Sequence, residues 1–175
     1  YHGVAPWMQD KSRPGIIDSD NEHVLKIKWN DIEGLEELLN VHGNDIACFI
    51  SSPYDHPVSR DNSLPEEGYW KKITSLCKQY EVLTIVDDVR AGFRINLGGS
   101  NVAFDFSPDM ICFGKAIANG HPLASLVGTE KLRHSAEKVY FTGTQFFSAP
   151  PMAAALATLD QLQKVNAPNK LIEYG

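Results

Sequence analysis

Three side chains in this sequence have types and positions that could do chemistry together. Asp87 and Asp88 directly follow the apolar run "TIV", and Lys115 follows the apolar "ICFG" just before a turn rich in glycine and proline. A lysine amine forms a Schiff base with a carbonyl when desolvation or a nearby cation lowers its pKa. A carboxylate pair after an apolar run can hold a cation. The two groups are therefore chemically complementary.

This pairing of an amine with a carboxylate suggests a cofactor. If the carbonyl belongs to pyridoxal phosphate, the ring nitrogen must stay protonated to draw electrons, and a buried carboxylate holds that proton. Asp87 and Lys115 would serve these two roles. Other interpretations remain open, because Asp87 could cap a turn and Lys115 could be an ordinary surface lysine. A metal site on Asp87 and Asp88 would need Asp55 or His56 as a further ligand.

The hydrophobic pattern predicts strands that alternate with helices. Strands are expected at residues 23–29, 46–50, 82–86, 109–114 and 123–128, and helices at residues 30–43, 63–80 and 148–165. This order favours right-handed crossovers and a mostly parallel sheet with helices on both faces, an α/β fold. In such a sheet the ligand site lies beyond the carboxyl ends of the strands, where Asp87 and Lys115 fall.

Composition narrows the class of protein. The 175 residues carry a net charge of −6, and the lysines and arginines are dispersed, so no nucleic-acid partner is expected. No apolar run approaches the roughly 18 residues that span a bilayer, so we expect no membrane segment and a cytoplasmic protein. The three cysteines, Cys48, Cys77 and Cys112, lie in apolar segments and are predicted to be buried reduced thiols.

Two segments carry a resemblance to a known family. "TIVDDVRAGFR" is similar to the Asp-Glu-Val-x-x-Gly-Phe-Arg signature of class III aminotransferases, which depend on pyridoxal phosphate, and "PDMICFGKAIANGHPLASLVG" resembles their lysine segment. Within the family the chain looks most like glutamate-1-semialdehyde 2,1-aminomutases. It shares a Tyr-His-Gly segment at residues 1–3 and a Gly-Thr segment at Gly143 and Thr144. The resemblance covers nearly the whole chain.

The resemblance implies that the chain forms part of the large domain of a fold-type-I transferase. Residues 1–175 would form a single partial domain, from the middle to the C-terminal part of the cofactor-binding domain. The N-terminal phosphate loop and the C-terminal small domain would lie outside it. A fragment of this kind is expected to be inactive alone.

The resemblance also assigns roles around the cofactor. It gives Lys115 the Schiff base and the later proton shuttle at the substrate alpha carbon, and it pairs Asp87 with the pyridine nitrogen. Val89 would press on one face of the ring while Tyr1 stacks on the other, and His2 would support the ring from beside Tyr1. No metal is expected.

A second set of implied roles concerns the subunit interface. Gly143 and Thr144 would bind the cofactor phosphate of the neighbouring subunit, which predicts a homodimer with its active site at the interface. The expected substrates are a small-molecule amino donor and a keto or aldehyde acceptor.

The chain also departs from the family pattern. Asp88 stands where the family usually has glutamate, and Ser52 in "SSPYDHP" replaces the glutamate of a Glu-Pro element. The roles of Asp55, His56 and Asp88 are therefore left open, and so is the choice between a transaminase and an aminomutase. The alternative from another class is a non-catalytic relative that keeps the fold as a binding or scaffolding module.

Overall fold

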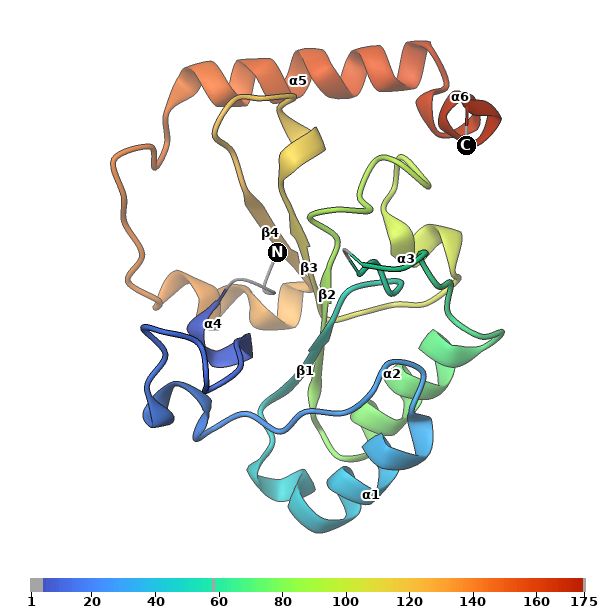
Figure 1. Cartoon of the computed structure of the whole chain (residues 1–175). Coiled ribbons are helices and arrows are strands. Elements are labelled where there is room, and N and C mark those ends of the chain that lie inside the picture. Colours follow the sequence, from blue (N-terminus) through green and yellow to red (C-terminus); the bar gives the residue numbers. More distant parts are fainter. Residues whose placement is uncertain (1–4, 58, 175) are drawn as a thin grey trace.

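A four-stranded sheet lies at the centre of the protein. The computed structural model describes residues 5–57 and 59–174. The strands are β1 (Cys48–Ser51), β2 (Leu83–Asp87), β3 (Met110–Phe113) and β4 (Ser125–Gly128), in the spatial order β1-β2-β3-β4 (Figure 1). The pairs β1–β2 and β2–β3 are parallel, and β4 runs antiparallel to β3. The predicted α/β fold with a mostly parallel sheet is confirmed.

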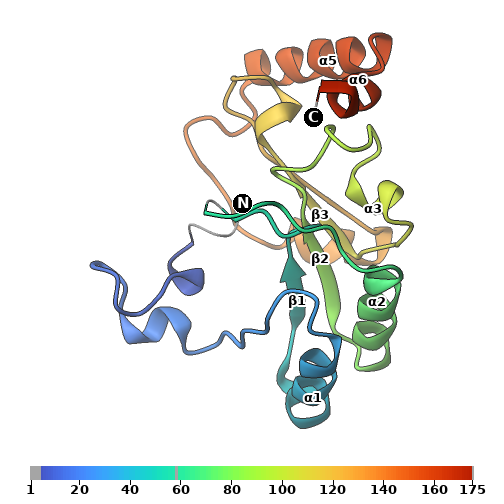
Figure 2. The same cartoon turned by 45° about the vertical axis from the view of Figure 1, so that its right-hand side comes forward.

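Two helices form the main core with β2. Helices α1 (Ile32–His42) and α2 (Tyr69–Gln79) lie together on one side of the sheet, and the segment before α1 extends on the other (Figure 2). The core contains Leu35, Leu39, Tyr69, Trp70, Ile73, Cys77, Val82, Val86 and Phe106. Trp70 stacks on Phe106 at 4.5 Å between ring centroids, and its Nε1 donates to Pro53 O at 2.9 Å. This bond ties the segment after β1 to the core.

The predicted helix at residues 63–80 begins later than expected. Gly68, at φ +74°, is the residue before α2, and Tyr69 is its first member. Ser63 instead exchanges two backbone hydrogen bonds with Asp55, at 2.9 and 2.8 Å. The residues around Ser63 therefore hold the loop after β1 and do not extend α2.

The strand predicted at residues 23–29 is wrong. Residues 24–28 have no regular secondary structure, although Ile27 and Trp29 pack against the main core. The alternation of apolar and polar residues reflects contact on one side of an extended segment that has no neighbouring strand.

The burial predicted for the cysteines holds only in part. Cys77 is buried and Cys112 is partly buried, but Cys48 is exposed; all three are free thiols. Cys48 opens β1, and in the described part of the chain β1 is an edge strand that pairs with β2 alone.

The C-terminal helices cross the end of the sheet toward which β1 points. Helix α5 (Ala149–Lys164) and helix α6 (Ala167–Tyr174) lie there, above the segment that follows β3 (Figures 1 and 2). A second core joins α5 to this segment and to the loop after β2, and its buried residues are Phe93, Ile117, Ala118 and Ala155. Within the described residues, none of the helices is both long and apolar enough to cross a membrane.

The remaining helices are short. Two are α-helical, α3 (Ser100–Ala103) and α4 (Arg133–Glu137). The others are 3₁₀ turns: η2 (Pro6–Met8), η3 (Asp18–Asn21), η4 (Gly43–Asp45), η5 (Lys115–Ile117) and η6 (Glu130–Leu132). Lys115 is thus the first residue of a 3₁₀ turn.

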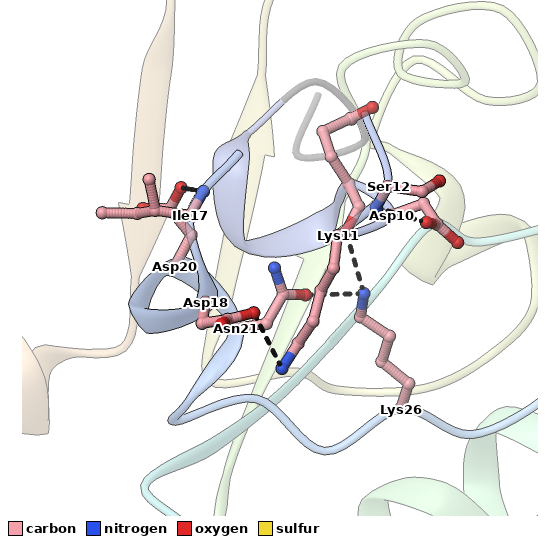
Figure 3. A network of polar contacts seen from close by, with 9 residues as sticks. Asp10, Lys11, Ser12, Ile17, Asp18, Asp20, Asn21 and Lys26 are labelled. Atoms are coloured by element: carbon pink, nitrogen blue, oxygen red, sulfur yellow. Dashed lines mark hydrogen bonds and ion pairs between the residues drawn. The ribbon is translucent and has the colours of Figure 1, made fainter. Parts of the chain in front are cut away.

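A polar network folds the N-terminal segment onto itself. Lys26 Nζ donates to Asn21 Oδ1 at 2.9 Å, and Asp20 Oδ2 accepts from Ile17 N at 3.0 Å (Figure 3). Asp10 Oδ1 accepts from Ser12 N at 2.8 Å. These contacts are exposed, so they shape this segment without burying it in the core.

Candidate active site at the carboxyl ends of β2 and β3

The parallel register of β2 and β3 places Asp87 beside the segment that leads to Lys115. Asp87, the last residue of β2, aligns with Cys112 of β3, and Lys115 follows shortly after that strand ends. Asp87 is only 3% exposed, and its Oδ1 accepts from Val89 N at 3.1 Å. A buried carboxylate is thereby fixed at the strand end beside the lysine.

Lys115 has an environment that lowers the pKa of its amine. Its φ is +43°, in the left-handed region. Partial burial of the amine lowers the pKa of Lys115, and the nearby Arg90 and Arg94 lower it further, while Asp87 acts in the opposite direction. A lysine with a lowered pKa has a larger nucleophilic fraction at neutral pH. The structure therefore brings Asp87 and Lys115 together, as the sequence predicts.

Val89 lies against the backbone just before Lys115. A Cβ atom built on Gly114 would come within 3.1 Å of Val89 Cγ1, so a larger residue would push the valine away. Gly92, in the same loop as Val89, is even closer to its neighbours. Its Cβ would lie 2.7 Å from Asp88 O and 2.8 Å from Phe113 Cδ1. These contacts fix the loop after β2 on the end of β3.

Asp88 holds the loop after β2 from within through its hydrogen bonds. The residue is 1% exposed, and its Oδ2 accepts from Ser100 N at 2.8 Å at the start of α3. Its own N–H donates to Cys112 O at 2.9 Å, and its carbonyl accepts from Gly92 N at 2.7 Å. Burial raises the pKa of the Asp88 carboxyl, although the hydrogen bonds from Ser100 oppose that shift. Asp88 is therefore a structural anchor.

Asp55 and His56 are already engaged by other side chains. Asp55 Oδ2 pairs with Arg60 Nη2 at 2.5 Å. Arg90 Nη1 lies 2.7 Å from His56 Nδ1 and donates to His56 O at 2.9 Å. Burial lowers the pKa of His56, and Arg90 adds to the shift while Asp87 and Asp55 oppose it. A neutral His56 can thus accept a hydrogen bond from Arg90. Among the described residues, no three potential metal ligands converge, so the metal alternative gains no support.

The other predicted cofactor residues lie elsewhere. Tyr1 and His2 are outside the described residues. Gly143 and Thr144 are exposed in the loop that leads into α5, where Gly143 O accepts from Phe146 N at 2.9 Å. The described chain therefore unites Asp87, Val89 and Lys115, and leaves the Gly-Thr segment at its surface.

Sequence reasoning missed Arg90 and Arg94. Both follow Asp87 in "DDVRAGFR" and both influence Lys115. Arg94 also lines a cleft of about 810 Å³ between the turn after Lys115 and α5. The signal was the presence of two arginines in the loop after a predicted strand end. Their approach to Lys115 depends on how that loop folds back.

Residues 12–173 match the family model described as Aminotransferase class-III. The chain belongs to the class-III aminotransferase family. It is 37% identical over 175 residues to an aminopentol aminotransferase of Sphingopyxis macrogoltabida, covering 100% of this chain and 41% of that relative. It is 36% identical to a glutamate-1-semialdehyde 2,1-aminomutase of Legionella pneumophila, covering 93% of this chain and 40% of the relative. The predicted family is confirmed, with aminotransferases and aminomutases both among its relatives.

A solved structure supports the same conclusion. The FumI protein of Sphingopyxis sp. MTA144, in a form described as the pyridoxal-phosphate internal aldimine, superposes with a TM-score of 0.86 at 37% identity. The match covers 93% of this chain and 39% of that one. This class-III chain thus spans about two fifths of the length of the relatives it matches.

Proposed function

We propose that the protein to which this chain belongs transfers amino groups with pyridoxal phosphate bound at Lys115. The observation that carries the proposal is the buried Asp87 carboxylate beside a lysine of lowered pKa, at neighbouring strand ends of a class-III aminotransferase chain. The substrates would be a small-molecule amino donor and a keto or aldehyde acceptor. The relatives include a protein named as an aminotransferase and one named as an aminomutase. The proposal therefore includes both transfer of the amino group between two molecules and its shift within one molecule.

The residues present fit the cofactor. Pyridoxal phosphate, when bound, supplies a carbonyl that condenses with an amine and a ring that draws electrons from the substrate. Asp87 would hold the ring nitrogen, because a buried carboxylate favours a protonated partner. Val89 would contact one face of the ring, since its side chain packs beside the Gly114 backbone that leads to Lys115. Lys115 would hold the carbonyl carbon.

Lys115 has a second task once a substrate amine replaces it. The released amine has a lowered pKa, so it can take a proton from the substrate alpha carbon and return it to a nearby carbon. The buried Asp87 carboxylate would stabilise the positive charge on the ring nitrogen of the cofactor. Proton transfer by Lys115 is thus the step that this chain's own residues perform.

The remaining roles complete the proposal. Tyr1 would stack on the ring beside His2, and Gly143 with Thr144 would bind the phosphate held by a neighbouring subunit. A homodimer follows from that assignment, and exposure of the Gly-Thr segment leaves it accessible to a second copy. Residues 1–175 would be one partial domain of a cytoplasmic enzyme.

Borohydride reduction tests the proposal. The full-length protein carrying this chain is expressed with pyridoxal phosphate, reduced, digested and mapped by mass spectrometry. We expect a phosphopyridoxyl group on Lys115, its loss in Lys115→Ala, and its retention in a control Lys138→Ala on the exposed surface. An unmodified Lys115 in folded, cofactor-supplied protein would overturn the enzyme proposal and favour a non-catalytic relative.

A further inference from the structure

The cleft beside Lys115 has the size and lining of a small-molecule site. Its volume is about 810 Å³, within the range of about 300–1,000 Å³ that is usual for ligand pockets. The turn after β3 forms one wall, with Lys115 and Asn119, and α5 forms the other, with Thr158 and Gln161. Arg94 also lines the cleft. Lys115 therefore faces both the cofactor residues and an adjoining space.

Arg94 brings a positive charge to this cleft, and among the described residues no acidic side chain pairs with it. In residues 5–57 and 59–174, Arg60 pairs with Asp55, and Arg133 pairs with Glu130 and Glu137. Within the same residues the Arg94 guanidinium has a single hydrogen bond, from Nη1 to Arg90 O, and no carboxylate partner. Its other donors remain available for a ligand.

Arg90 adds to this positive charge. Its guanidinium contacts His56 Nδ1 and His56 O, which are uncharged partners. Within the described residues Arg90 also lacks a carboxylate partner. Arg90 and Arg94 thus bring two positive charges to the surroundings of Lys115, where Asp87 supplies an opposing negative charge, and both arginines lower the pKa of Lys115. An anion entering the cleft would offset the excess positive charge.

The other lining residues indicate the chemistry of the uncharged part of the ligand. Leu123, Leu162 and Ala157 present apolar surface to the cleft, and Gln161 and Thr158 supply neutral polar groups. A guanidinium recognises a carboxylate through two parallel hydrogen bonds. The matching ligand is an aliphatic chain that ends in a carboxylate.

We infer that Arg94 binds the carboxylate of an aliphatic substrate whose reacting amine or carbonyl lies at Lys115. Arg94 is then a specificity-determining residue, and the substrates are amino acids or keto acids in which an apolar chain links the two groups. The inference rests on the proposed function, because it takes Lys115 as the reacting end.

The first test measures binding without turnover. Isothermal titration of the full-length holoenzyme compares pentanoate with 1-pentanol, in the wild type and in Arg94→Gln. We expect the wild type to prefer pentanoate, and Arg94→Gln to weaken pentanoate binding by about ten-fold or more with little effect on pentanol. Arg133→Gln, which removes an exposed arginine that pairs within its own segment, is the control and should bind as the wild type does. Equal pentanoate affinity in wild type and Arg94→Gln would overturn the inference.

A second pair of variants leaves Arg94 intact. Ala157 is exposed on α5 and lines the cleft, so Ala157→Glu places a carboxylate there while Ala157→Gln adds a similar volume without charge. We expect pentanoate binding to fall more in Ala157→Glu than in Ala157→Gln. Equal effects of the two substitutions would show that the ligand charge is not read in this cleft. This pair decides the question even if Arg94→Gln fails to fold.

A kinetic arm separates this inference from the proposed function. The half-reaction with 5-aminopentanoate is compared with that of pentylamine. Arg94→Gln should raise the KM for the amino acid by about ten-fold and leave the KM for the amine nearly unchanged. A phosphopyridoxyl group on Lys115 with equal KM changes for both donors would refute the Arg94 assignment alone. Weakened cofactor binding with unchanged pentanoate affinity would assign Arg94 to the cofactor phosphate instead, which would also refute it.

Discussion

Asp87 and Asp88 are neighbours in the sequence, yet their side chains serve different ends. Successive side chains of an extended strand point to opposite sides. Asp87 contacts the loop that carries Val89 and influences Lys115, whereas Asp88 bonds Ser100 at the start of α3. One carboxylate is therefore available for the chemistry, and the other fixes the loop that shapes the site.

The pH dependence of stability at His56 follows from its lowered pKa. Burial and Arg90 hold the folded-state pKa of His56 below its unfolded value of about 6.5, so the unfolded chain takes up the proton first. The stability that neutral His56 contributes is fully present above pH 6.5 or so and is lost as the pH falls toward the folded pKa. We expect the free energy of unfolding to decline on acidification through this window.

Urea denaturation at a series of pH values checks this prediction. His56→Gln can still accept a hydrogen bond from Arg90 but does not titrate, so its decline between pH 7 and 5 should be smaller than that of the wild type. The exposed His134 provides the control, since His134→Gln should leave the wild-type slope unchanged. Identical slopes for wild type and His56→Gln would show that His56 does not titrate differently on folding.

Among the elements, the loop between β2 and α3 depends most on one side chain. Asp88→Ala would leave Ser100 N buried without its acceptor, and an unmet buried donor costs about 1–3 kcal/mol of unfolding free energy. Asp88→Asn keeps an oxygen for Ser100 N and removes a carboxyl whose ionisation is opposed by burial. We therefore expect Asp88→Asn to be at least as stable as the wild type at pH 7, and Asp88→Ala to be clearly less stable.

Chemical denaturation of the three proteins measures the difference. The prediction also extends to the site, because the same loop carries Val89 and Arg94. Asp88→Asn should retain cofactor attachment at Lys115. A large loss of stability in Asp88→Asn would mean that the charge, and not the hydrogen bond, anchors the loop.

The elements also show what the sequence could and could not predict. Asp87 and Lys115 were found because apolar runs of strand length end just before them, and parallel neighbours bring such ends together. Arg94 was missed because its position depends on the loop after β2 folding back toward α5. The strand predicted at residues 23–29 failed because alternation measures one-sided burial, which Ile27 and Trp29 achieve without a strand partner. An alternating hydrophobic pattern alone cannot distinguish a paired strand from an unpaired extended segment that is buried on one side.

At the scale of the whole molecule, the loop before α5 gathers several exposed aromatic side chains. Val139, Tyr140, Phe141 and Phe147 are 69%, 90%, 71% and 77% exposed, and Phe146 contacts Phe141 and Phe147 at ring-centroid distances of 5.5 and 4.3 Å. Exposed aromatic clusters of this kind mark interaction surfaces. The same loop carries Gly143 and Thr144, so the proposed dimer would cover the aromatic side chains and bring the Gly-Thr segment to a neighbouring cofactor.

The dimer can be tested through this loop. Tyr140→Ser with Phe147→Ser removes two large rings that are mostly exposed, so we expect the full-length protein to keep its helical content but to shift toward the monomer. Light scattering after size-exclusion chromatography measures the mass, and circular dichroism measures the fold. Leu64→Ser, which alters another exposed apolar side chain far along the sequence, is the control. If the double variant remains a dimer with full cofactor occupancy, the aromatic loop is not the interface and Thr144 does not serve a neighbouring subunit. If the monomer forms and its affinity for cofactor falls, the phosphate site depends on assembly.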